Sequence, residues 1–211
     1  MKIARILYPV TVLGPGKRIG IWVVGCSKRC PGCANPELWD GQRYPVVDIL
    51  QIKRTIDALY EKANGQVDGI TISGGEPFEQ VEELLELVSY LRNRTDDILV
   101  FTGKKKESLE KNELSSQILA KIAVLVDGEY IEAQNEGEVL RGSNNQNIHI
   151  LNKDVTEMYA SYQKENNGKH LVENFRVSDG VVAVGIHKKD FKNALATCLE
   201  TKDIIKKDTK G

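Results

Sequence analysis

Residues 20–33 read GIWVVGCSKRCPGC. The first five form a short apolar run without a charged residue, and Cys26, Cys30 and Cys33 follow at intervals of four and three. An apolar run of this length is typical of a strand whose two faces are both covered, as in a parallel sheet. The stretch therefore predicts a buried strand that ends in a loop bearing three thiols.

Similar apolar runs recur along the chain and are separated by helical patterns. The predicted strands are 20–24, 69–73, 98–102, 123–126 and 148–151. The segments with an apolar residue at every third or fourth position, typical of amphipathic helices, are 46–63, 80–94 and 108–121. This alternation of strands and helices predicts an α/β fold with a parallel sheet.

The length of the chain limits which α/β fold it can form. A complete eight-stranded βα barrel needs about 250 residues, whereas this chain has 211. Five or six βα units would fit, which predicts a partial (open) βα barrel over residues 1–154. Residues 155–211 are expected to form a small α+β appendage: a polar connection, a β-hairpin over 175–186 around Ser178-Asp179-Gly180, and a closing helix over 191–205.

Composition excludes several classes of protein. Twenty-nine Lys and Arg against thirty Asp and Glu give a net charge of -1, so we expect no nucleic-acid partner. No apolar stretch reaches the roughly 20 residues of a membrane span, and no secretory leader is recognisable. We therefore expect a cytoplasmic protein without a membrane partner.

The cysteines are distributed unlike a disulfide framework, because three lie together and Cys198 stands alone. Three thiolates bind three irons of a 4Fe-4S cluster and leave the fourth iron open, whereas electron-transfer clusters are usually held by four cysteines. A closed zinc site also needs four ligands, and the nearest histidine, His149, is more than a hundred residues away. We favour the cluster and keep zinc as the alternative. Cys198 is predicted to be a small buried hydrophobic residue.

A second motif, Ser73-Gly74-Gly75-Glu76-Pro77, lies at the end of the second predicted strand. Parallel α/β folds bind ligands at this edge of the sheet. Two glycines allow the backbone to approach a ligand closely, and a carboxylate accepts hydrogen bonds from an ammonium group. The alternative is an ordinary strand-to-helix turn in which Pro77 begins the helix.

The two motifs together, about forty residues apart, resemble those of the radical S-adenosylmethionine (SAM) enzymes. Other segments resemble the branch of that family which activates glycyl radical enzymes, in particular the activating proteins of anaerobic ribonucleoside-triphosphate reductases. These segments are GPGKR at 14–18, NPELW at 35–39, FTG at 101–103, LVDG at 125–128 and RGSNNQ at 141–146. Leu13 and Lys104 depart from the pattern, which has Asp and Tyr there. The resemblance extends over residues 3–151.

The resemblance implies a chemistry and a set of residues for it. A 4Fe-4S cluster on Cys26, Cys30 and Cys33 would bind SAM at its open iron and cleave it reductively, giving a radical that abstracts hydrogen from a glycine of a partner. SAM would be held by Ser73, Gly74, Gly75, Glu76, Thr102, Gly103 and Asp127. Substrate or partner would be contacted by Arg141, Ser143, Asn145 and Gln146. The implied partners are an anaerobic ribonucleotide reductase and an electron donor such as flavodoxin.

Two other functions remain open at this point. One is a radical SAM enzyme that modifies a different peptide or a small molecule, with the C-terminal hairpin and helix helping to bind it. The other is a non-catalytic iron-sulfur or zinc-binding partner protein, which would keep the metal without cleaving SAM.

Overall fold

The computed structural model describes residues 1–136, 139–163, 172–177, 180–187, 191 and 197. Cys198, the turn residues Ser178 and Asp179, and most of the predicted closing helix lie outside these residues. Among the described residues, no helix has both the length and the apolar character needed to cross a membrane.

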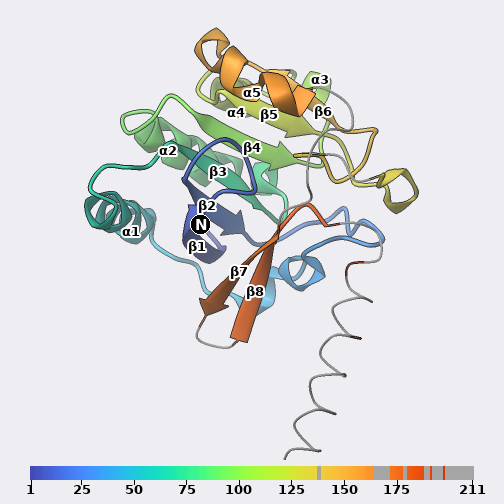
Figure 1. Cartoon of the computed structure of the whole chain (residues 1–211), viewed down its shortest axis with the longest axis horizontal. Helices are drawn as coiled ribbons and strands as arrows, with labels where there is room; N and C mark the ends of the chain where they lie inside the picture. The colour runs from blue at the N-terminus through green and yellow to red at the C-terminus, as the bar shows by residue number, and fades with distance from the viewer. Residues whose placement is uncertain (137–138, 164–171, 178–179, 188–190, 192–196, 198–211) are drawn as a thin grey trace, which may run out of the picture.

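The central element is a six-stranded sheet whose strands lie side by side in chain order (Figure 1). The strands are β1 Ile3–Val10, β2 Arg18–Val23, β3 Gly69–Gly74, β4 Ile98–Thr102, β5 Val124–Asp127 and β6 Asn147–Ile150. Strands β2 to β5 are parallel, and β1 and β6 pair antiparallel at the two edges. All five predicted strands are present within two residues of their expected bounds, and β1 was missed because Arg5 and Pro9 interrupt its apolar pattern.

Helices connect the parallel strands. They are α1 Ile49–Lys62, α2 Val81–Leu91, α3 Lys106–Leu109 and α4 Glu113–Leu119, with short 3-10 helices η1 Pro36–Leu38, η2 Gly41–Arg43 and η3 Pro77–Glu79. A further 3-10 helix, η4 Glu132–Gln134, lies between β5 and the antiparallel β6. The prediction of one continuous helix over 108–121 was wrong. Asn112 accepts a hydrogen bond from the backbone N–H of Ser115 at 2.9 Å and so begins a new helix, α4, after α3 has ended.

Different parts of the chain pack on the two faces of the sheet. Side chains alternate along a strand, so Ile21 and Val23 of β2 pack in the same core as α1, α2 and α4, whereas Trp22 and Val24 lie in another. Strands in sequential order joined by right-handed crossovers place the helices on one face. The structure is thus a mixed α/β fold, and its closure as a partial barrel stays a prediction.

The second face is covered by residues from the C-terminal part of the chain. Helix α5 Thr156–Gln163 follows η5 Lys153–Val155 and buries Tyr159 among Leu99, Val124 and Val126. The sequence predicted only a polar connection here, because the apolar residues of α5 alternate with polar ones and form no clear amphipathic stripe. Strands β7 Val172–Val177 and β8 Gly180–Gly185 pair antiparallel, which confirms the predicted hairpin. Its Val184 packs with Trp22 of the sheet. The division at residue 154 stays a prediction.

A buried ion pair joins several elements at the amino ends of the parallel strands. Arg18 and Asp97 are 0 % and 4 % exposed, and Nη2 of Arg18 donates to Oδ1 of Asp97 at 3.2 Å. The guanidinium also donates from Nε to Oγ1 of Thr71 at 2.7 Å and from Nη2 to the carbonyl of Ile70 at 2.9 Å. The hydroxyl of Tyr159 donates to Oδ1 of Asp97. The charges are therefore satisfied from β2, β3 and α5 together.

Candidate functional site

The cysteine loop begins where β2 ends, at the opposite end of the strands from the buried ion pair. Two hydrogen bonds attach it to the η1 segment: Gly25 N–H donates to the carbonyl of Leu38 at 2.8 Å, and Cys26 N–H donates to that of Trp39 at 3.2 Å. Arg29 has a φ of 47°, a left-handed conformation that curls the loop between its first two cysteines. The loop thus brings its three thiols to the carboxyl edge of the sheet.

Two opposing influences act on the thiols of the cysteine loop. Cys26, Cys30 and Cys33 are not joined in disulfides, and Cys30 is buried. Burial raises the pKa of Cys26 and of Cys30, and backbone N–H groups oppose this, those of Arg29 and Lys28 at Cys26 and that of Tyr130 at Cys30. Such donors favour the deprotonated form that a metal requires.

The donor set is also informative. Three sulfur ligands suit iron-sulfur chemistry. In the part of the chain that the structure describes, which includes the three cysteines, no three His, Cys, Asp or Glu side chains are grouped closely enough to hold a single metal ion.

The Gly74-Gly75 motif packs directly on the cysteine loop. Gly75 N–H donates to the carbonyl of Val23 at 2.8 Å, and Glu76 N–H donates to that of Gly25 at 2.7 Å. A Cβ on Gly74 would lie 2.4 Å from the carbonyl oxygen of Val23, and one on Gly75 would lie 2.3 Å from that of Gly25. The structure shows that the two glycines admit the backbone of β2 and of the cysteine loop. That they also admit a ligand stays a prediction.

Glu76 joins the ends of two neighbouring strands. Its side chain is 1 % exposed. Oε1 accepts from Oγ1 of Thr102 at 2.7 Å and from the N–H of Phe78 at 3.1 Å, and Oε2 accepts from the N–H of Gly103 at 2.8 Å. Burial raises the pKa of Glu76, and these hydrogen bonds oppose the rise. A carboxylate has about four acceptor positions, so roughly one remains for a ligand.

A pocket of about 190 Å³ opens beside the cysteine loop. Of the predicted SAM residues, Ser73, Gly74, Gly75 and Thr102 line it, together with Cys33. Its other lining residues include Phe101, Tyr130, Asn135, Gly142 and Gln146. Glu76, Gly103 and Asp127 lie outside the lining. The pocket thus combines a thiol, strand-end backbone and aromatic rings that include those of Phe101 and Tyr130.

Asp127, at the end of β5, is fully buried, and both of its carboxylate oxygens already accept hydrogen bonds. Oδ2 accepts from the N–H of Lys106, the first residue of α3, at 2.7 Å. Oδ1 accepts from Nδ2 of Asn147 at 3.1 Å and lies 3.3 Å from Nε2 of His149. Burial alone would raise the pKa of Asp127, but these groups outweigh it and lower the pKa. Its contacts hold the start of α3 against the edge of the sheet.

The predicted partner residues of the RGSNNQ segment fold the segment itself. Gln146 donates from Nε2 to the carbonyl of residue 128 at 2.7 Å, and Asn145 donates from Nδ2 to that of residue 129 at 2.7 Å. The hydroxyl of Ser143 accepts from the N–H of residue 131 at 3.1 Å, and Arg141 donates to the carbonyl of Gln146 at 3.3 Å. Three of these side chains therefore fix the loop after β5, and Gln146 alone of the four lines the pocket.

Sequence reasoning missed the part of the pocket wall that comes from the C-terminal region. Gly185, Ile186, His187 and Phe191 line the pocket. The carbonyl of His187 accepts from Nδ2 of Asn135 at 2.9 Å, and the His187 ring stacks on Phe191 with centroids 4.1 Å apart. Only the predicted hairpin pointed in this direction, and nothing in its residues indicated that it would end beside the cysteines.

Known proteins resemble the chain over most of this site. The family model described as a 4Fe-4S single cluster domain matches residues 12–149. The anaerobic ribonucleoside-triphosphate reductase-activating protein of Escherichia coli K12 is 35% identical over 153 residues, which cover 68% of this chain and 96% of that protein. The protein of the same name from enterobacteria phage T4 is 31% identical over 147 residues, covering 67% and 90%.

The Haemophilus influenzae protein of that name is 34% identical over 148 residues, covering 67% of this chain and 94% of its own length. The relatives are thus covered almost completely, while about a third of this chain lies outside each match. Strands β7 and β8 follow the last residue that the family model matches.

Proposed function

Because the chain belongs to the family of anaerobic ribonucleoside-triphosphate reductase-activating proteins, we propose that it reductively cleaves SAM and thereby places a glycyl radical on such a reductase. It is an activating enzyme with a 4Fe-4S domain. A small one-electron donor such as flavodoxin completes the proposed system. The open sheet, with sequential parallel strands and the helices that connect them on one face, supports a partial βα barrel of the radical SAM type.

One observation carries the proposal: backbone hydrogen bonds join the Gly74-Gly75-Glu76 turn both to the end of β2 and to the cysteine loop, beside one pocket. A group bound at Cys33 and a ligand lying along Gly74 and Gly75 would therefore be in contact. The direct pairing fixes the spacing between the two binding elements, which is what a reaction between cofactor and ligand requires.

The residues divide the proposed work as follows. Cys26, Cys30 and Cys33 hold the cluster, which, when bound, supplies the electron that splits SAM into methionine and a 5′-deoxyadenosyl radical able to take a hydrogen atom from glycine. Gly74 and Gly75 offer backbone groups to the methionine end of SAM.

Glu76 acts mainly as a positioning residue, because its carboxylate fixes Thr102 and Gly103 at the pocket. Phe101, Tyr130 and Ile186 supply apolar surface that excludes water from a reactive radical.

The test is anaerobic reconstitution of the protein with iron and sulfide, followed by incubation with reductant, SAM and the reductase from the same genome. We expect a glycyl radical signal in electron paramagnetic resonance and one 5′-deoxyadenosine per radical. Cys30→Ala should abolish the cluster and SAM cleavage together, while the matched control Cys198→Ala, outside the motif, should retain both.

The two other functions have their own signatures in this experiment. SAM cleavage without a glycyl radical would indicate a different substrate. A bound cluster or zinc without any SAM cleavage would indicate a non-catalytic partner protein.

A further inference from the structure

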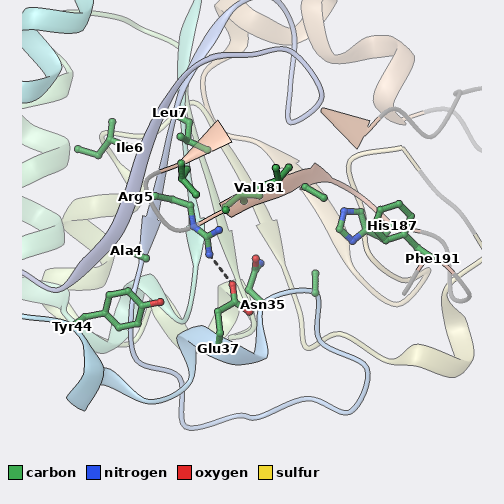
Figure 2. A pocket seen from close by; sticks show the side chains of 15 residues that line it. Ala4, Arg5, Ile6, Leu7, Asn35, Glu37, Tyr44, Val181, His187 and Phe191 are labelled. Atoms are coloured by element: carbon green, nitrogen blue, oxygen red, sulfur yellow. Dashed lines mark hydrogen bonds and ion pairs between the residues drawn. The ribbon is translucent and has the colours of Figure 1, made fainter. Parts of the chain in front are cut away.

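A second, larger hollow of about 600 Å³ lies between β1, β8 and the segment that precedes η1 (Figure 2). Residues 4–7 of β1 and 180–183 of β8 line it in unbroken succession. Successive side chains of a strand point to opposite faces, so a hollow lined by consecutive residues follows the edge of the strand rather than one of its faces. We call this hollow the edge groove.

Both strands that border the edge groove have an available edge. Strand β1 is the outermost strand of the six-stranded sheet, and β8 has only β7 as a neighbour among the described strands. An extended peptide that lies along such an edge gains main-chain hydrogen bonds, and side-chain pockets then give specificity. The groove is therefore suited to a polypeptide in extended conformation rather than to a compact small molecule.

The side chains of the edge groove are mainly aliphatic, with one ion pair. Ile6 and Leu7 of β1 line the groove but also pack against the two cores of the protein, whereas Val181 of β8 is 69% exposed although it is a large apolar residue. Arg5 points to Glu37, with Nη2 2.7 Å from Oε1 (Figure 2). The exposed side chain of Val181 offers a contact to an aliphatic side chain of a peptide lying in the groove.

The edge groove adjoins the pocket beside the cysteines. Ala34, His187 and Phe191 line both hollows. Figure 2 shows the stacked rings of His187 and Phe191 at one end of the groove, away from Tyr44. A chain lying in the groove would thus pass these rings on its way to Cys33.

We infer that the edge groove binds an extended segment of the partner reductase and leads the reacting glycine into the pocket. This inference rests on the proposed function. A glycine within a polypeptide reaches the pocket only with its neighbours attached, and those neighbours need a channel that opens from it. The edge groove lies next to the pocket, shares three lining residues with it and is bordered by two strand edges. Because β8 lies beyond the family match at residues 12–149, this wall adds partner selectivity specific to the chain.

The first test is photocrosslinking with p-benzoyl-L-phenylalanine in place of Val181. The same probe in place of Leu50, a residue of α1 that is 56% exposed and outside the groove, is the matched control. We expect a covalent adduct between position 181 and the glycine-bearing segment of the reductase, located by mass spectrometry, and none from position 50. The protein is used without reconstitution, so the result does not depend on cluster chemistry.

The second test measures affinity. Val181→Asp should weaken reductase binding at least 10-fold by calorimetry, and Leu50→Asp should leave it unchanged. Both side chains are exposed, so neither change should impair folding, which circular dichroism checks. Wild-type affinity in Val181→Asp, or crosslinks only to a second copy or to the chain's own C-terminal residues, would overturn the inference. Failure of the wild-type protein to form a glycyl radical would instead overturn the proposed function.

Discussion

The hydroxyl of Tyr159 donates a hydrogen bond of 2.7 Å to Oδ1 of Asp97, 62 residues earlier in the chain. Tyr159 is fully buried, and Asp97 is already paired with the buried Arg18. Buried ion pairs favour folding only when their remaining hydrogen-bonding positions are also satisfied. Helix α5 therefore completes the network that joins the amino ends of β2, β3 and β4.

Tyr159→Phe should lower the free energy of unfolding by about 1–3 kcal/mol, because it leaves an acceptor position of a buried carboxylate without its donor. Urea denaturation at pH 7 measures the change. Tyr162→Phe is the matched control, since its ring lies 5.8 Å from that of Tyr159 in the same cluster. Equal losses in the two variants would show that the Tyr159 hydroxyl has no special role.

We expect the protein to lose stability at high pH because of the raised pKa of Tyr159. Burial is the main cause of the rise, and the neighbouring Asp97 adds to it, so the pKa lies far above that of an exposed tyrosine. Above about pH 10 the unfolded chain releases this proton and the folded chain keeps it, so stability falls as the pH rises. The stability difference between wild type and Tyr159→Phe should therefore shrink above about pH 10, and a constant difference would contradict the assignment.

Arg18→Met should cost about 3–5 kcal/mol, because it leaves Asp97 buried without its cation. The matched control is Arg94→Met, which removes one partner of the exposed pair Arg94 and Asp57 and should cost less than about 1 kcal/mol. Guanidinium denaturation measures both. In the double variant Arg18→Met/Asp97→Leu we expect a smaller loss than the sum of the single changes, and additive losses would argue against direct coupling.

Asp127→Asn should destabilise the protein by about 1–2 kcal/mol at neutral pH, since a charged acceptor is lost from the N–H of Lys106. The folded-state pKa of Asp127 is lowered, so its contribution is complete above about pH 5 and is lost as the pH falls through the folded value. Urea midpoints of wild type and variant should thus converge in acid. If the difference between the two urea midpoints grew as the pH fell, the result would contradict the lowered pKa of Asp127.

Gly75→Ala should reduce cluster binding. Its Cβ would lie 2.3 Å from the carbonyl oxygen of Gly25, and backbone cannot rotate away as a side chain does. We expect a several-fold lower iron and sulfide content after reconstitution. In the control, Gly41→Ala, the nearest atom is the flexible Nζ of Lys2 at 3.3 Å, and the iron content should stay at the wild-type level. Normal loading of Gly75→Ala would show that the contact is dispensable.

Much of the fold could be predicted because its information is local. The predicted strands are apolar runs that lie between two cores, and this pattern depends only on neighbouring residues. The break at Asn112 and the edge strand β1 could not be predicted in the same way. Asn112 interrupts a helix through a capping contact that apolar periodicity does not register, and an edge strand needs no continuous apolar run.

The candidate site shows a similar division. The motifs identified the segments that meet at the pocket, including Cys33, Gly74 and Thr102. Their individual contacts could not be predicted, because they depend on tertiary structure: Glu76 faces Thr102 and Gly103, and Asp127 faces α3. The assignment of SAM and partner contacts to these residues stays a prediction.

The two backbone bonds that join Gly25 to Glu76 and Val23 to Gly75 use no side chain and no iron. The link between the two binding elements of the site therefore consists of backbone atoms alone. Loss of an iron-sulfur cluster to oxygen removes none of these atoms, so we expect the link to persist. Repair of a damaged molecule would then require fresh iron, sulfide and thiol reduction rather than a new polypeptide.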